Sequence, residues 1–186
     1  MKSKSEWYAT KFELSRGRWR SNRKLVGPGS RLVSDLQVAA YERALHKHAK
    51  GRLVDLGCGN APLAGIYQDL VDSFLWVDWP NSPHQVFEVD QFADLNVGLD
   101  FGDESFDTLL LSDVLEHVAQ PEALFKELAR IMRSGATLIV GVPFLYWIHE
   151  EPNDHHRFTR YKLSDFGIVN GLEVVEVKEV GGGLDT

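Results

Sequence analysis

The residues most suited to chemistry form a glycine turn that follows an apolar run. Residues 53–56 are strand-like and include Asp55, and the run leads into Gly57, Cys58 and Gly59. Glycine lets a ligand approach the backbone closely because it has no Cβ, and a helix that starts after such a turn offers unpaired N–H groups. The pattern predicts a ligand-binding turn, and a tight structural turn capped by Asp55 is the alternative.

A second acidic position follows at the end of the next apolar run. Asp78 ends the run 74–78 and stands next to Trp79. A carboxylate at the carboxyl end of a strand can accept hydrogen bonds from both hydroxyls of a ribose, and the adjacent indole could stack on a base. The alternative for Asp78 is a turn cap before Pro80.

The segment 106–118 adds a third group of polar residues after an apolar run. Ser112 and Asp113 follow the run, and Glu116 and His117 come shortly afterwards. If this part is helical, Asp113, Glu116 and His117 stand at positions i, i+3 and i+4 and share one face.

In this order the motifs resemble the class I S-adenosylmethionine-dependent methyltransferases. The closest resemblance is to small-molecule members with a DLGCG turn, here 55–59, and an LEHV box, here 115–118. The resemblance covers roughly residues 53–180. It implies S-adenosyl-L-methionine as the cofactor and an enzyme of the methyltransferase class (EC 2.1.1.-).

The resemblance also assigns roles to single residues. The glycine turn would meet the methionine part of the cofactor. Asp94 and Leu95 resemble the pair that recognises adenine, with Asp90 as a rival for the carboxylate. Backbone carbonyls of Ser112 and Asp113 would meet the ammonium group.

A metal site is the alternative use of the polar residues in segment 106–118. The trio of Asp113, Glu116 and His117 resembles a set in some quinone-pathway O-methyltransferases, and this resemblance implies that it could ligate a divalent cation. We expect instead that His117 packs beside the cofactor pocket. The prediction is therefore that no metal is bound and that activity survives EDTA.

The segment 143–159 lies where this fold places its substrate loop, and it is rich in aromatic residues and histidines. His149, His155 and His156 are candidates for the general base, because imidazole titrates near neutrality. For at least two of them a structural role is the expectation, and alignment of the reactants could make a base dispensable. Asp154 and Arg157 could form a local ion pair.

We predict methyl transfer to a small-molecule acceptor, favouring O-methylation of a sugar or another hydroxyl. Two rival functions stay open: an RNA or other nucleic-acid methyltransferase, and a non-catalytic module that binds a cofactor or a partner. A nicotinamide-dependent dehydrogenase is less favoured, because the turn lacks the third glycine of G-x-G-x-x-G.

Composition and charge limit the remaining possibilities. Residues 1–52 hold 13 Lys or Arg against 4 Asp or Glu, whereas the whole chain of 186 residues has a net charge of −7. We expect a basic N-terminal arm, 1–30, that either folds back on the acidic body or binds anions. The single cysteine excludes an internal disulfide, and we expect a cytoplasmic protein with no membrane span. The oligomeric state cannot be predicted.

The alternation of strand and helix signals predicts an α/β fold, 31–186, of the Rossmann-like, doubly wound, three-layer type with a mostly parallel sheet. No run is left for the seventh strand usual in this fold, so we expect a shortened or truncated C-terminus. The predicted strands lie near 52–56, 74–78, 86–90, 106–111, 136–141 and 172–179. The predicted helices lie near 30–48, 61–71, 113–118, 121–133 and 162–170.

Overall fold

Five parallel strands form the central sheet, in the spatial order β5-β4-β3-β6-β7. The computed structural model describes residues 2–84 and 87–181. Because the first strand of the sheet, β3, lies in its middle, the chain winds outward in both directions, as predicted for a doubly wound fold. The strands are β3 (Arg52–Leu56), β4 (Ser73–Asp78), β5 (Gln91–Phe92), β6 (Phe106–Ser112) and β7 (Met132–Gly141).

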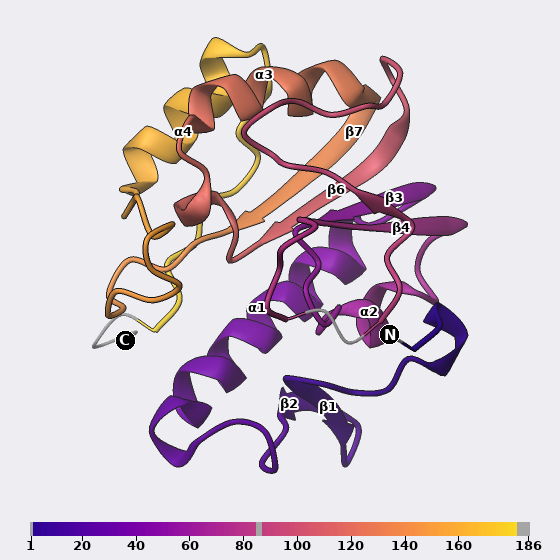
Figure 1. The fold of residues 1–186 in the computed structure, drawn as a ribbon, viewed down its shortest axis with the longest axis vertical. Helices are drawn as coiled ribbons and strands as arrows, with labels where there is room; N and C mark the ends of the chain where they lie inside the picture. Colours follow the sequence, from indigo (N-terminus) through magenta and orange to yellow (C-terminus); the bar gives the residue numbers. More distant parts are fainter. Residues whose placement is uncertain (1, 85–86, 182–186) are drawn as a thin grey trace.

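Helices cover both faces of this sheet, which confirms the α/β prediction. Figure 1 shows α3 and α4 on one face and α1 with α2 on the other. Side chains alternate between the two cores: Leu53 belongs to the core under α1, and its neighbour Val54 belongs to the core under α3. This is the period of a strand buried on both faces. The helices are α1 (Arg31–His48), α2 (Ala64–Tyr67), α3 (Pro121–Ile131) and α4 (Arg160–Val169).

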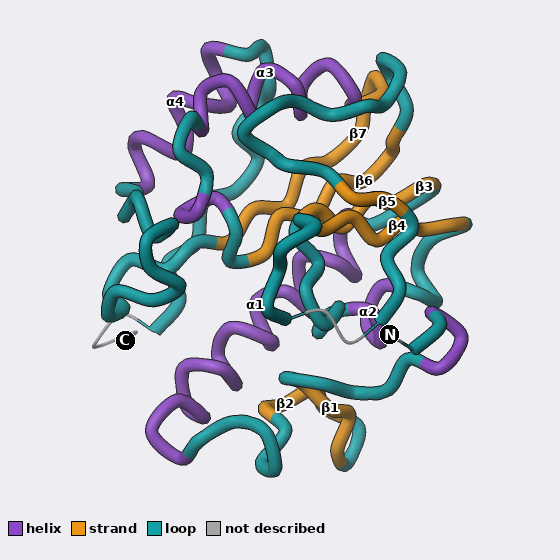
Figure 2. Tube along the Cα trace, viewed as in Figure 1, coloured by secondary structure: helices purple, strands orange, loops and turns teal. Residues whose placement is uncertain are grey.

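The N-terminal segment is more regular than predicted. It contains an antiparallel hairpin of β1 (Phe12–Ser15) and β2 (Arg18–Ser21), flanked by the short 3-10 helices η1 (Lys4–Glu6) and η2 (Pro28–Ser30). The hairpin lies beneath α1 and α2 (Figure 2). Arg16 and Gly17 both have positive φ, 52° and 73°, as two-residue turns between twisted strands require.

Two tryptophans fix the N-terminal segment to the body. Trp7 and Trp19 pack on the core under α1, and both rings lie against Gly65 of α2. The Trp7 Nε1–H also donates to the Ala61 carbonyl at 3.1 Å. Thr10 extends the contact, since its hydroxyl donates to the Asn60 carbonyl at 3.2 Å. The segment therefore folds against the residues that follow the glycine turn.

Several predicted elements are shorter than expected or displaced. The helix expected near 61–71 is the single turn α2, and the helix expected near 113–118 is the 3-10 turn η3 (Leu115–His117). Of the strand expected near 86–90, residue 86 lies outside the described residues and Phe87 forms one isolated bridge to Lys2. The pairing with β4 is made slightly later in the chain, by β5.

The strand expected near 172–179 does not form. These residues have no regular structure in the described part of the chain, and most of them are exposed. The Leu172 N–H donates a hydrogen bond of 3.0 Å to the Gly167 carbonyl, so the chain turns at the end of α4. Charged side chains then contact helices instead of joining a strand ladder: Glu176 meets Lys47 of α1 at 3.1 Å, and Glu179 meets Arg160 of α4 at 3.3 Å. The valines of this run favoured a strand, but they could not specify a pairing partner.

Candidate functional site

The glycine turn lies at the carboxyl edge of the sheet, between the two halves of the fold. It is fastened to β4, because Gly57 N–H and Cys58 N–H both donate to the Val77 carbonyl, at 2.8 and 3.1 Å. Gly57 and Gly59 have φ of +71° and +52°, the left-handed region that favours glycine. Cys58 is buried, and burial raises the pKa of its thiol.

Gly57 is also required by a close neighbour. A Cβ added at Gly57 would lie 2.6 Å from the Cγ2 atom of Val114, which follows β6. The turn after β3 and the segment after β6 are therefore in contact. This is the crevice in which open α/β sheets bind ligands.

Asp55 points into the core beside the turn. Its Oδ2 accepts a hydrogen bond of 2.8 Å from the Tyr67 hydroxyl, which in turn accepts one of 2.8 Å from Trp76 Nε1–H. Burial, and to a smaller extent the neighbouring charge of Asp78, raise the pKa of Asp55 to about 7, although the hydrogen bond from Tyr67 opposes the rise. The Asp55 carboxylate is thus bonded to Tyr67 rather than to the turn, and its contact with the cofactor stays a prediction. The sequence did not single out Tyr67, whose only signal was an aromatic residue after the turn.

Asp78 is the last residue of β4 and is buried at the sheet edge. Its Oδ1 accepts the Trp79 backbone N–H at 2.9 Å, while the Trp79 ring is exposed. The Asp78 carbonyl accepts Ala93 N–H at 3.0 Å. This bond places the loop after β5 directly beside the predicted ribose carboxylate.

Asp94 and Leu95 follow in that loop and are half-buried. The Asp94 Oδ1 accepts from the backbone N–H and the side-chain amide of Asn96, at 2.9 and 3.0 Å. Leu95 packs on the core under α3. The pair therefore reaches the same sheet edge as Asp78, with the carboxylate held in a local turn.

Ser112 ends β6, and Asp113 begins the loop that follows. Asp113 has a positive φ of 54°, and its N–H donates to the Gly141 carbonyl at 2.9 Å. Its carboxylate accepts a hydrogen bond from Gln37 Nε2–H of α1 and lies 3.6 Å from Lys11 Nζ. The proposed sharing of one helical face with Glu116 and His117 is thus wrong, because Asp113 precedes the 3-10 turn and faces α1.

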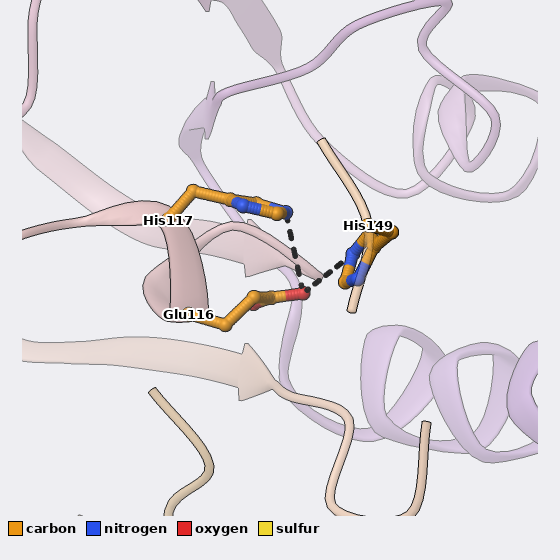
Figure 3. Close-up of side chains that lie close together, drawn as sticks. All are labelled: Glu116, His117 and His149. Carbon is orange, nitrogen blue, oxygen red and sulfur yellow. Dashed lines mark ion pairs between the residues drawn. The ribbon is translucent and has the colours of Figure 1, made fainter. Parts of the chain in front are cut away.

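Glu116 and His117 instead meet a residue from the substrate loop, His149. Figure 3 shows the two imidazoles directed at one carboxylate. The Glu116 Oε1 lies 3.7 Å from His117 Nε2 and 3.8 Å from His149 Nε2. Glu116 is fully buried, and this burial raises the pKa of its carboxyl group to about 8. We call these three side chains the Glu116 cluster.

The Nδ1 atom of each histidine in the cluster lies against an oxygen atom of the substrate loop. His117 Nδ1 lies 3.1 Å from the Asn153 carbonyl, and His149 Nδ1 lies 3.1 Å from Asp154 Oδ2. Arg157 binds both oxygens of Asp154, at 2.5 and 2.8 Å, which confirms the predicted ion pair. The Arg157 guanidinium holds the pKa of Asp154 well below its usual range.

The two other histidines proposed as bases lie outside the cluster. The backbone N–H groups of His155 and His156 donate to the Glu116 carbonyl, at 2.9 and 3.2 Å, and so fasten the substrate loop to η3. The His155 side chain is exposed, and the His156 ring lies 5.0 Å from the ring of Phe158. Of the three candidates, His149 is the one that belongs to the Glu116 cluster.

The fold and the glycine turn at its switch point define a class of protein. The methyltransferase domain family matches residues 30–168, most of the chain, and the protein belongs to this family. Membership indicates S-adenosyl-L-methionine as the cofactor, as predicted from the motif order. The matched residues include every position to which a cofactor contact was assigned.

Individual relatives agree with this family. The chain is 27% identical over 165 residues to the ubiquinone biosynthesis O-methyltransferase of Parvibaculum lavamentivorans, covering 74% of this chain and 65% of that one. A Haloferax volcanii chain solved in a complex with the Trm112 methyltransferase activator has a TM-score of 0.64 at 22% identity, covering 76% of this chain and 71% of that one. An S-adenosylmethionine-dependent methyltransferase from Aquifex aeolicus has a TM-score of 0.59 at 18% identity, covering 86% and 90%. The chain spans less than two thirds of the length of the curated relatives it matches.

Proposed function

We propose that this protein transfers a methyl group from S-adenosyl-L-methionine to a hydroxyl group of a small acceptor such as a sugar or a phenol. The observation that carries the proposal is the position of the Glu116 cluster beside the glycine turn. Val114, which contacts Gly57, stands two residues before Glu116. Groups able to take a proton therefore belong to the segment that contacts the turn at which the methyl donor is proposed to bind.

The cluster has the chemistry that hydroxyl methylation needs. The acceptor oxygen must lose its proton as it attacks the sulfonium methyl, and imidazole is a suitable base near neutrality. Asp154 lies against His149 Nδ1 and so favours the tautomer in which Nε2 carries the lone pair. A base that is oriented by a carboxylate is a recurring catalytic arrangement.

The acceptor class has support from one relative by name. The Parvibaculum lavamentivorans protein is an O-methyltransferase of ubiquinone biosynthesis, which means that it methylates an oxygen atom. Exposed aromatic rings in the substrate loop, Tyr146 and Trp147, stack with centroids 4.4 Å apart. Such rings suit an acceptor with an apolar face.

Nucleic acid is a less favoured acceptor, because part of the basic N-terminal charge is engaged by the body. Lys4 pairs with Asp90 at 2.6 Å, and Lys11 lies 3.6 Å from Asp113. Free basic groups are needed to neutralise phosphates.

Within residues 2–84 and 87–181, no helix has the length and apolar character to cross a membrane.

The proposal is tested by following the methyl group of isotopically labelled S-adenosyl-L-methionine into three acceptor sets: phenols and catechols, sugar nucleotides, and RNA. We expect label in a hydroxyl of one of the first two sets. His149→Ala should lower turnover by roughly 10²-fold, the usual scale for lost acid–base help, with little change in cofactor affinity. His155→Ala is the matched control, because its side chain is exposed. Labelling of RNA alone would contradict the proposal, as would full turnover in His149→Ala.

A further inference from the structure

The hydrogen bonds of the two histidines fix what the Glu116 cluster presents at its centre. A carbonyl oxygen can only accept, so His117 Nδ1, at 3.1 Å from the Asn153 carbonyl, carries a proton. His149 Nδ1 has two acceptors, Asp154 Oδ2 at 3.1 Å and the Trp147 carbonyl at 3.3 Å. In a neutral imidazole the other nitrogen then has the lone pair. Both Nε2 atoms therefore direct lone pairs at the Glu116 carboxylate.

The third member of the cluster is a carboxylate without a donor. Glu116 is fully buried, and neither of its oxygens accepts a hydrogen bond of ordinary geometry from another residue in the described part of the chain. The distances of 3.7 and 3.8 Å to the imidazoles exceed a hydrogen bond. An unpaired buried carboxylate is costly. Two imidazole lone pairs and a buried carboxylate that face one another would all be satisfied by one cation bound between them; without a cation, a proton held by Glu116 would take its place.

We propose that Glu116, His117 and His149 bind one divalent transition-metal ion such as Zn²⁺, Fe²⁺ or Co²⁺. Two imidazoles and one carboxylate are a ligand set for these ions. The three ligand atoms lie within 4.8 Å of one another. Atoms bound about 2.1 Å from one ion stand roughly 3.4 Å apart at a tetrahedral angle, so binding requires only a small closure of the cluster.

The surroundings of the cluster have the form of a supporting shell for a metal site. Ligating histidines commonly donate their second N–H to a carboxylate or a backbone carbonyl, which fixes the ring and its tautomer. Here Asp154 serves His149, and the Asn153 carbonyl serves His117. Arg157 in turn locks Asp154 through two hydrogen bonds.

Three protein ligands leave a coordination position open, as in catalytic zinc sites. A hydroxyl group that occupied this position would have its pKa lowered by the ion. With the ion bound, His149 Nε2 is a ligand and could not act as the base proposed above; the bound hydroxyl would instead release its proton to solvent, because the ion lowers its pKa. The metal site itself does not depend on the proposed methyl transfer, because ion binding is measured with neither donor nor acceptor present.

The experiment is a titration of the full chain, without an affinity tag and freed of metal by a chelator, with Zn²⁺ by calorimetry and with Co²⁺ by visible absorption. We expect one ion per chain and ligand-field bands of Co²⁺ with nitrogen and oxygen ligands. Glu116→Gln and His149→Ala should each weaken binding more than about 10-fold. Asp154→Asn, which changes no ligand but weakens both the support of His149 and the ion pair with Arg157, should weaken it roughly 10-fold. His155→Ala should bind like the parent.

A second measurement and two contradicting results complete the test of the metal site. Thermal unfolding with and without Zn²⁺ gives a second readout, since an ion bound only by the folded state raises the midpoint, and circular dichroism shows that each variant folds. The proposal is overturned if the folded parent binds no ion. It is also overturned if Glu116→Gln and His149→Ala bind as tightly as the parent, because the ion would then be held elsewhere.

Discussion

At the scale of single residues, Gly57 offers a sharp test of how the turn is built. Gly57→Ala places a methyl group 2.6 Å from Val114 Cγ2 and keeps a φ of +71°. The left-handed conformation alone costs about 1–2 kcal/mol for a residue with a Cβ, and overpacking adds roughly 1–3 kcal/mol. The free energy of unfolding measured by urea denaturation should fall by the sum of the two costs, and S-adenosyl-L-methionine binding should weaken.

Gly135→Ala is the matched control for this prediction. Gly135 has nearly the same φ, +73°, but nothing lies within 4 Å of an added Cβ. Gly135→Ala should therefore lower the free energy of unfolding only by the cost of the left-handed conformation, about 1–2 kcal/mol. Equal losses of stability in the two variants would show that Val114 moves away freely, and the close contact would then not constrain the turn.

We predict that Asp55 makes the stability of the cofactor-free protein depend on pH. Burial raises the pKa of Asp55 to about 7, above the value of about 3.9 in an unfolded chain. The folded state then holds the proton more tightly than the unfolded chain. The contribution of Asp55 to the free energy of unfolding is therefore fully present below pH ~4 and is lost as the pH rises to about 7. The fall is at most about 4 kcal/mol. Tyr67 and Asp78 are the neighbours that shape this titration.

Asp55→Asn removes the ionisable group and keeps an oxygen for the Tyr67 hydroxyl. Free energies of unfolding measured between pH 4 and pH 8 should decline less in this variant than in the parent. The exposed Asp100→Asn should follow the parent. The buried Glu116 contributes a slope of the same sign, so the difference between variants is the quantity that matters. An unchanged decline in Asp55→Asn would show that Asp55 is already ionised in the folded state.

At the scale of elements, the docking of the N-terminal segment depends on Gly65. A Cβ at Gly65 would lie 2.4 Å from Trp19 Cη2 and 2.7 Å from Trp7 Cη2. Replacing glycine by alanine usually stabilises a helix by up to about 1 kcal/mol. Gly65→Ala should instead lower the thermal midpoint, because both indoles must move.

The helical glycine of α4 provides the control, since a Cβ at Gly167 meets Val174 Cγ2 only at 3.5 Å, an ordinary contact. Gly167→Ala should be neutral or stabilising in the same melting experiment. If Gly65→Ala were as stable as Gly167→Ala, the two indoles would not hold the segment against α2.

The elements also show where the sequence was informative. Long apolar runs bounded by acidic residues predicted β3, β4 and β6, because a buried parallel strand needs such a run. The two-residue turn at Arg16 and Gly17 gave no comparable signal, since only one of its residues is glycine. The valines of 172–179 had strand propensity, yet propensity alone does not supply a neighbouring strand.

At the scale of the whole molecule, contacts between distant segments were the part that the sequence could not provide. The spacing within 113–117 suggested a trio on one helix, but the structure puts Asp113 against α1 and brings His149 to Glu116 and His117. The prediction that no metal binds weighed only that local trio against packing of His117 beside the cofactor pocket, and it stays untested. His149 was chosen for its place in the substrate loop, and nothing in the sequence indicated that it meets Glu116.

The central claim is that this sheet edge binds S-adenosyl-L-methionine, and calorimetry on the parent and on Asp78→Ala tests it most directly. We predict one cofactor per chain in the parent and a loss of about 1.5–3 kcal/mol in Asp78→Ala, the range for hydrogen bonds to a charged group. Asp72→Ala is the control, because Asp72 is exposed just before β4, at the opposite end of that strand. No binding to the folded parent, or equal affinity in Asp78→Ala, would contradict the claim.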